Sequence, residues 1–173
     1  MGSYNKGKDV AAKWARDNFN QGATCLDVGA CNGKWFDLLG DHFVMDAVEV
    51  WEPYAQKYKL AEKYKNVFIK DIRQFNYSFY DLIIFGDVIE HMTVEEAQHV
   101  LAYASDHCQN MLVAVPFLYE QGAKNNNPFE IHQQPDLTPE LFNERYPGFN
   151  PVFIVEDYAY FVKHREVKND AFD

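Results

Sequence analysis

The stretch Cys25-Leu-Asp-Val-Gly-Ala-Cys-Asn-Gly33 decides the fold that this sequence predicts. Its first residues are typical of a buried strand, and Gly29 then begins a tight turn. Glu49 ends a second apolar run, about 20 residues after Gly29. A glycine turn lets the backbone approach a ligand closely, and a carboxylate at that distance can bind ribose hydroxyls. The layout predicts a site for a nucleoside cofactor.

The same turn argues against a dinucleotide cofactor. The pattern G-x-G-x-x-G needs a second glycine for the approach to a pyrophosphate and a third for close packing of the helix. Cys31 and Lys34 stand at those two positions. A Gly-Lys-Ser/Thr run, which a P-loop would require, does not follow either. Nicotinamide-dependent oxidation is therefore disfavoured.

Strand-like and helix-like segments alternate along the chain. The first helix is predicted from Asp9 to Phe19, with Val10, Trp14 and Phe19 on its apolar side. Seven strands are predicted at residues 23–28, 44–50, 67–69, 80–85, 111–115, 152–155 and 158–162. This order predicts a doubly wound α/β fold, with a mostly parallel, seven-stranded, Rossmann-like sheet and helices on both faces. The last two strands follow each other without a helix, which predicts an antiparallel strand at the sheet edge.

Two local patterns support this assignment. The run from Tyr80 to Phe85 is nearly all apolar, as expected of a strand that is buried on both faces of a parallel sheet. Thr93 is predicted to begin a helix, because Glu96 three residues later completes a capping box.

A family resemblance follows from these segments. The run Leu26-Asp27-Val28-Gly29-x-x-x-Gly33 resembles the first motif of the class I S-adenosylmethionine-dependent methyltransferases. Four further segments resemble motifs of that family in the same order: Glu49–Tyr54, Lys70–Ile72, Tyr80–His91 and Met111–Pro116. The third of these four is similar to the corresponding motif of the subgroup called type 11. The resemblance covers about residues 20 to 120. It implies S-adenosylmethionine as the cofactor and methyl transfer as the reaction.

The resemblance also implies a set of cofactor-binding residues. They are Asp27, Gly29, Ala30, Cys31, Gly33, Glu49, Val50, Asp71, Ile72 and Asp87. Asp27 is expected to orient the glycine turn or to bind the ammonium group of the cofactor, directly or through water. Glu49 is expected to bind both ribose hydroxyls. Asp71 is expected to accept a hydrogen bond from the adenine amino group, with Ile72 against the ring.

Three residues leave alternatives open. Cys31 stands where glycine is most common in the family, and its side chain narrows the approach of the methionine portion. Trp51 and Phe75 are candidates for flanking the adenine, and plain core packing is the alternative for both.

Asp87, Glu90 and His91 follow the fourth predicted strand, and His132 lies in a later loop. Asp87, His91 and His132 are the candidate catalytic residues, with His91 as a general base for an acceptor hydroxyl. Alternatively, all four side chains bind a divalent metal ion, since carboxylates and imidazoles are suitable ligands. A similar acid-x-x-Glu-His pattern occurs in metal-dependent small-RNA 2′-O-methyltransferases, and also in many type 11 members without a metal. A third interpretation is that Glu90 and His91 only cap and orient the loop.

The segment from Phe117 to Leu137 is the one long loop in the prediction. Together with the first 20 residues it is expected to form the acceptor pocket. We interpret residues 1–173 as a single methyltransferase domain, with a cofactor-binding half at 20–120 and the acceptor loop and closing strands at 117–173.

Composition limits the partners and the compartment. The net charge of −10 disfavours a nucleic-acid substrate, because an acidic surface repels phosphates. No apolar run of about 18 residues and no apolar N-terminal core is present, so no membrane span or signal peptide is expected. The three cysteines have no C-x-x-C spacing, which favours free thiols. We expect a cytoplasmic monomer or homodimer.

The sequence therefore predicts S-adenosylmethionine-dependent methyl transfer, to a hydroxyl of a small-molecule or glycan-type acceptor. Two alternatives stay open. One is a non-catalytic module that binds S-adenosylmethionine and acts in interactions, and the substituted Cys31 motivates it. The other is a metal-dependent O-methyltransferase.

Overall fold

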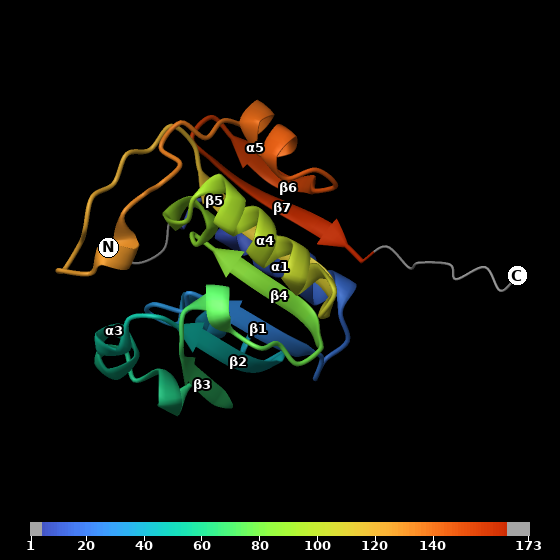
Figure 1. The fold of residues 1–173 in the computed structure, drawn as a ribbon. Coiled ribbons are helices and arrows are strands. Elements are labelled where there is room, and N and C mark those ends of the chain that lie inside the picture. The colour runs from blue at the N-terminus through green and yellow to red at the C-terminus, as the bar shows by residue number, and fades with distance from the viewer. Residues whose placement is uncertain (1–4, 166–173) are drawn as a thin grey trace, which may run out of the picture.

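The computed structural model describes residues 5–165 of the 173-residue chain. One sheet has the strand order β3-β2-β1-β4-β5-β7-β6 (Figure 1). The strands are β1 (Thr24–Val28), β2 (Val44–Glu49), β3 (Asn66–Ile69), β4 (Tyr80–Gly86), β5 (Cys108–Pro116), β6 (Asn150–Val155) and β7 (Tyr158–His164). Strands β1 to β5 pair in parallel, and β7 is antiparallel to both β5 and β6. The predicted Rossmann-like sheet, with antiparallel pairing at one edge, is confirmed. Residues 1–4 and 166–173 of the predicted single domain lie outside the described residues.

Strand β4 shows why the sheet is buried on both faces. Ile83 and Phe85 belong to the hydrophobic cluster on one face, and Leu82 and Ile84 to the cluster on the other. All four side chains are fully buried. Successive side chains of a strand point to opposite faces, so an unbroken apolar run supplies both clusters. Each such burial contributes about 1.5–3 kcal/mol.

Helices cover both faces of the sheet, as predicted. The helices are α1 (Lys8–Asn18), α2 (Lys34–Leu39), α3 (Glu52–Lys57), α4 (Val94–Ser105) and α5 (Pro139–Arg145). In Figure 1, α4 lies in front of the sheet and α1 behind it. Thr93 and Glu96 form the predicted capping box at the start of α4. None of the helices within residues 5–165 has the length and apolar character needed to cross a membrane.

The buried face of α1 matches the prediction in part. Trp14 and Phe19 are partly buried and pack against the hydrophobic core, whereas Val10 is exposed. The most deeply buried residues of the helix are Lys8, Ala11, Ala12 and Ala15. The helix packs against both α2 and β6. The small alanine side chains let α1 approach α2 and β6 closely. The prediction relied on the large apolar residues of the helix and therefore missed these alanines.

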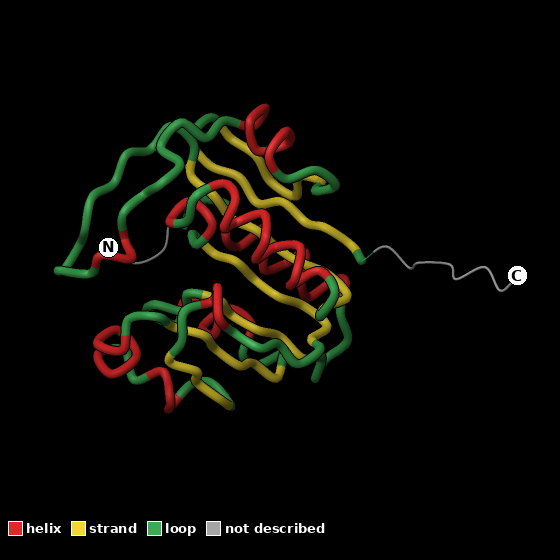
Figure 2. The backbone as a smooth tube through the Cα atoms, viewed as in Figure 1, coloured by secondary structure: helices red, strands yellow, loops and turns green. Residues whose placement is uncertain are grey.

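The segment between β5 and α5 is an extended arm. It contains one short 3₁₀ turn, Pro128–Glu130, and is otherwise loop (Figure 2). The two branches of the arm are connected to each other. The Leu118 amide donates to Leu137 O at 2.9 Å, and the His132 amide donates to Gln121 O at 2.9 Å. The arm lies at the end of the sheet to which the arrowheads of β2 and β4 point (Figure 1).

Candidate functional site

A cavity of about 400 Å³ lies at the carboxyl ends of the parallel strands. Its wall is formed by the glycine turn after β1, the end of β2, the segment after β3, the end of β4 and the arm. This volume is in the range of small-molecule sites, which commonly occupy this position in open α/β sheets.

The glycine turn forms one wall of the cavity. Gly29 has a φ of 68°, and a Cβ atom at this position would lie 2.7 Å from Val88 Cγ2. Its amide donates to Val48 O at 2.8 Å, so the turn is held against β2. Ala30 and Cys31 follow in the cavity wall. Only glycine combines this backbone conformation with the close contact to Val88.

Cys31 also has a positive φ, of 45°. L-residues rarely adopt this left-handed region, which favours glycine. The conformation therefore agrees with the glycine expected here from the family resemblance. Burial, and then the charge of Glu49, raises the pKa of the Cys31 thiol to about 12. The thiol is therefore protonated and weakly reactive near neutral pH.

Glu49 is tied to the turn by the backbone. Its Oε2 accepts from the Cys31 amide and its Oε1 from the Trp51 amide, both at 2.8 Å. The side chain is only 3% exposed and faces the cavity. Burial raises its pKa, although the two backbone hydrogen bonds oppose that shift. Each carboxylate oxygen can accept more than one hydrogen bond, so capacity is left for a ligand hydroxyl.

Asp71 and Ile72 line the opposite part of the cavity. The Asp71 carboxylate is engaged by Arg73, whose Nη2 lies 2.6 Å from Oδ2 and whose backbone amide donates to Oδ1 at 2.9 Å. Arg73 also donates to Glu96 Oε1 of α4 at 2.7 Å. Partial burial raises the pKa of Asp71, but the bonds and charge of Arg73 together outweigh it and hold the pKa below its ordinary value. Sequence reasoning missed Arg73, which also lines the cavity.

Asp27 and Gly33 do not line the cavity. Asp27 is fully buried behind the turn, where the Tyr64 hydroxyl donates to its Oδ2 at 2.5 Å. The role of Asp27 toward the turn or the cofactor ammonium group stays a prediction. Burial raises the pKa of Asp27 to about 7, against opposing effects of Tyr64 and then Lys8. Gly33 has a φ of 73° and precedes α2.

The two aromatic candidates also lie outside the cavity wall. Phe75 is buried in the core, in contact with Phe68 and Tyr77. Trp51 contacts Phe129 of the arm, with ring centroids 6.3 Å apart. Core packing therefore accounts for Phe75.

Asp87 stands at the end of β4 and lines the cavity. It has a φ of 58°, an uncommon conformation for a residue other than glycine. Its Oδ1 accepts a hydrogen bond from the hydroxyl of Tyr158, which also lines the cavity. Tyr158 is 71 residues away in sequence, and no local pattern indicated this partner.

The structure brings His91 and His132 together. Their ring centroids are 4.8 Å apart, in an edge-to-face arrangement. Burial lowers the pKa of both imidazoles, and for His91 the neighbouring His132 lowers it further. Both rings are therefore neutral near pH 7. His91 comes from the short turn Ile89–His91 after β4, and His132 from the arm.

Glu90 lies beside this histidine pair and is 1% exposed. Burial, and then the charge of Asp87, raises its pKa well above the ordinary value. Ligand atoms of Glu90, His91 and His132 lie within 4.8 Å of one another. Asp87, the fourth residue of the predicted metal set, is not part of this group.

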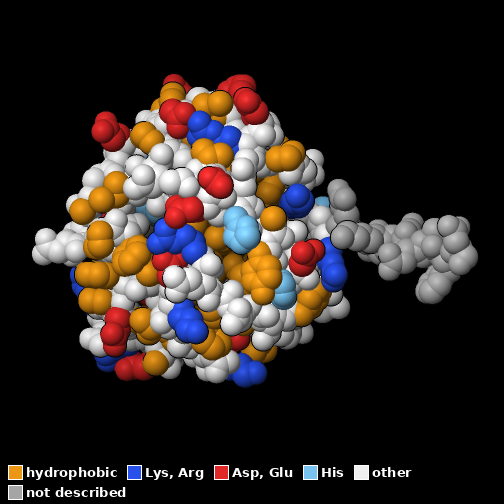
Figure 3. All heavy atoms as spheres, viewed as in Figure 1, with side chains coloured by type: hydrophobic (Ala, Val, Ile, Leu, Met, Phe, Trp, Pro, Cys, Tyr) orange, Lys and Arg blue, Asp and Glu red, His pale blue; other side chains and the backbone are white. Residues whose placement is uncertain are grey.

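The expected contribution of the N-terminal segment is not found. No residue of 5–20 lines the cavity, because α1 packs on α2 and β6. The arm does line the cavity, with residues including Tyr119, Gln121 and Glu130, and its role in binding an acceptor stays a prediction. On the face shown in Figure 3, acidic, basic and hydrophobic side chains are interspersed, so the negative charge is not gathered in one patch there.

No protein-family profile and no curated protein matches the sequence. Solved structures do match. An S-adenosylmethionine-dependent methyltransferase from Clostridium acetobutylicum has a TM-score of 0.71 at 12% identity, over 95% of this chain and 93% of that chain. The N-methyltransferase NodS from Bradyrhizobium japonicum, in complex with S-adenosylhomocysteine, has a TM-score of 0.65 at 12% identity, over 94% and 87%. The mitomycin 7-O-methyltransferase MmcR has a TM-score of 0.62 at 13% identity, over 91% and 53%.

The chain has the class I methyltransferase fold.

In this class I fold the cavity lies at the switch point of the sheet. From β1 the chain proceeds outward to β2 and β3, and it then returns to β4 on the other side of β1. The loops after β1 and β4 therefore diverge and leave a crevice. Gly29 and Asp87 stand on the two sides of that crevice, at the ends of the paired strands β1 and β4.

Proposed function

We propose that this protein transfers a methyl group from S-adenosylmethionine to a hydroxyl of a small-molecule or glycan-type acceptor. The main support is the connection between the glycine turn and Glu49. The Cys31 amide and the Glu49 carboxylate are joined at the cavity wall, so the turn and the ribose-binding acid are held as one unit. Chain topology also agrees, since the fold is that of class I methyltransferases.

The cofactor-binding half is residues 20–120 in this proposal. Glu49 binds the ribose hydroxyls, and Ile72 packs on the adenine ring. Asp71 accepts a hydrogen bond from the adenine amino group, which competes with Arg73 for the same carboxylate. Gly29 and Cys31 supply backbone next to the methionine portion. Asp27 acts from behind the turn by holding it in place with Tyr64.

The bound cofactor supplies an activated methyl group: the carbon–sulfur bond breaks with its electron pair on sulfur, and a carbon–oxygen bond forms to the acceptor. The residues must position the acceptor and remove the hydroxyl proton. Alignment of this kind contributes up to about 7–11 kcal/mol. His91, His132 and Asp87 all line the cavity, and both imidazoles have lowered pKa values, which supports a histidine as the proton acceptor.

The acceptor is expected under the arm, within residues 117–137. Tyr119, Gln121, Glu130 and His132 supply mixed aromatic and polar lining there, which suits a small polar molecule. The type 11 resemblance, the choice of oxygen as the methylated atom and the glycan class of acceptor are part of this proposal.

Calorimetric titration with S-adenosylmethionine, S-adenosylhomocysteine and NAD tests the cofactor. We expect the two adenosyl ligands to bind and NAD not to bind. Glu49→Ala should weaken binding of S-adenosylhomocysteine at least tenfold, because the ribose loses its acceptor and the turn loses its side-chain bond to β2. Glu52→Ala is the matched control, since Glu52 is an exposed acid three residues later.

Failure of both adenosyl ligands at millimolar concentration would contradict the proposal. An acceptor screen with labelled methyl donor then tests the reaction. Tight cofactor binding without transfer to any acceptor would favour the non-catalytic binding module instead.

A further inference from the structure

We propose that Glu90, His91 and His132 bind a divalent metal ion at the cavity wall, in the class Zn²⁺, Mn²⁺, Co²⁺ or Fe²⁺. Each residue offers one ligand atom, and these atoms lie within 4.8 Å of one another. The three side chains come from two segments, the turn after β4 and the arm, and all three line the cavity.

Glu90 is the first observation that indicates a cation. The side chain is 99% buried, yet neither carboxylate oxygen has a hydrogen-bond partner within residues 5–165. His91 Nε2 lies 3.9 Å from Glu90 Oε1. A buried polar group without partners costs free energy, and a carboxylate in such a place is usually paired or bound to a metal. A cation between Glu90 and the histidines would satisfy it.

The orientation of the two imidazoles is the second, independent observation. His132 Nδ1 lies 2.7 Å from Tyr119 O, and His91 Nδ1 lies 3.3 Å from Ile131 O. A carbonyl can only accept, so each Nδ1 carries the proton and each Nε2 presents a lone pair. Metal-binding histidines are commonly held in this way, with the second ring nitrogen donating to a carbonyl. Both rings are therefore prepared as Nε2 ligands.

The distances are somewhat wider than those around a bound ion. Ligand atoms of a tetrahedral site with bonds of about 2.1 Å are about 3.4 Å apart. A separation of 4.8 Å therefore has to shorten by about 1.4 Å when the ion binds. His132 and the other two ligands come from different segments, so the binding of an ion would draw the arm toward the turn after β4. Two imidazoles and one carboxylate suit Zn²⁺ and the other transition ions better than Mg²⁺ or Ca²⁺, which prefer oxygen ligands.

The ion would act on the acceptor, and this consequence rests on the proposed function. Three protein ligands leave coordination positions open, as catalytic rather than structural metal sites do. An ion held there would lower the pKa of an acceptor hydroxyl and so favour loss of its proton to solvent water. With the ion bound, neither imidazole could act as the general base, because both Nε2 lone pairs would bind the ion. The ion would then take over the activation of the acceptor hydroxyl. Asp87, bonded to Tyr158, stands beside the site and adds negative charge.

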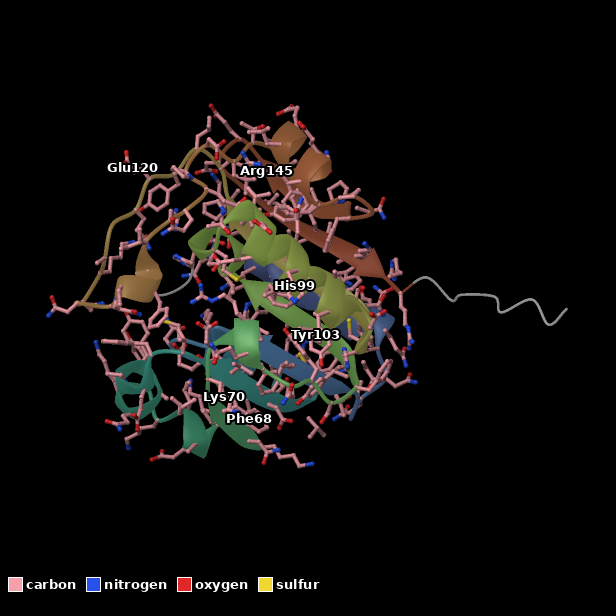
Figure 4. All side chains as sticks on the ribbon, in the orientation of Figure 1. Phe68, Lys70, His99, Tyr103, Glu120 and Arg145 are labelled. Carbon is pink, nitrogen blue, oxygen red and sulfur yellow. The ribbon has the colours of Figure 1, made fainter. Side chains whose placement is uncertain are left out.

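The test is direct titration of untagged protein with Mn²⁺, followed by the loss of the electron paramagnetic resonance signal of the free ion. We expect one bound ion per chain, displaced by Zn²⁺ or Co²⁺. Glu90→Gln and His132→Gln should each weaken binding at least tenfold. The matched control is His99→Gln. His99 is an exposed histidine on α4, labelled in Figure 4 well away from the arm that carries Glu120, and it should bind as the natural protein does.

His132→Gln changes a half-buried loop residue, so it keeps the test decisive if the buried Glu90→Gln variant does not fold. Absence of one-site binding of Mn²⁺, Zn²⁺ and Co²⁺ at millimolar concentration would overturn the inference, as would equal affinity in His132→Gln and His99→Gln. Titration with S-adenosylhomocysteine on the same samples separates the two proposals. Adenosyl binding without ion binding rejects the metal site alone, and ion binding without adenosyl binding rejects the proposed function alone.

Discussion

Cys31 adopts a left-handed backbone conformation, and its amide rather than its thiol makes the bond to Glu49. A substitution that keeps the amide should therefore keep the site. The strained backbone and the partly buried, protonated thiol are separate consequences of placing cysteine at this point of the turn.

For Cys31→Gly we expect an affinity for S-adenosylhomocysteine within about threefold of the natural protein and a free energy of unfolding changed by less than about 1 kcal/mol. Glycine relieves the positive φ but gains freedom in the unfolded chain, so the two effects oppose each other. Calorimetry and urea unfolding measure both quantities. A tenfold change in affinity would show that the thiol itself contacts the ligand or blocks it.

Asp27 should give the folded protein a pH-dependent stability. Burial raises its pKa to about 7 in the folded state, compared with about 3.9 for an unperturbed aspartate. A raised pKa in the folded state favours the protonated form. Its stabilising effect is therefore fully present below about pH 4 and is lost as the pH rises through about 7.

We expect the free energy of unfolding of the natural protein to fall between about pH 5 and about pH 7. In Asp27→Asn the fall over the same range should be smaller by about 2 kcal/mol. Urea unfolding at several pH values measures the difference. The asparagine side chain can still accept the hydrogen bond from the Tyr64 hydroxyl. The raised pKa of Glu90 affects both proteins alike, so its contribution cancels in the comparison. Equal slopes in the two proteins would contradict the assigned pKa.

At the scale of elements, the arm depends on one buried glutamine. Gln134 is 3% exposed, and its side-chain amide donates to Ile89 O at 2.9 Å and Met92 O at 3.1 Å. Its Oε1 accepts from the Tyr146 hydroxyl at 2.8 Å. These bonds connect the arm to the turn that carries His91 and to the end of α5.

Gln134→Ala should lower the free energy of unfolding by about 2–4 kcal/mol, because it leaves buried carbonyls and a hydroxyl without partners. Urea unfolding measures it. The neighbouring Gln133→Ala is the control, since Gln133 is exposed and its backbone bond to Glu90 O is retained. Similar effects of the two substitutions would mean that the arm is held by other contacts.

Elements were predicted best where the signal is local. The strand of residues 80–85, the capping box at Thr93 and the closing hairpin all follow from neighbouring residues, and the structure has them. The buried face of α1 was predicted only in part, since Trp14 and Phe19 pack on the core but Val10 is exposed. Its alanines carry little hydrophobic signal, and they are buried because α2 and β6 lie close to them.

At the scale of the whole molecule, the sheet order creates the site. The carboxyl ends of β1, β2 and β4 meet at one edge, and the arm extends over the same end. The glycine turn, Glu49 and Asp87 are thereby gathered around one cavity, although they are far apart in sequence.

The sequence by itself determined the fold class, the glycine turn and the acids at the strand ends, because strand periodicity, turns and caps depend on near neighbours. Only the tertiary structure decided which groups meet. It paired Asp87 with Tyr158, engaged Asp71 with Arg73, buried Asp27 against Tyr64, and set His132 of the arm beside Glu90 and His91. Such contacts join segments that are distant along the chain, and they depend on side-chain direction and burial. No local pattern encodes them.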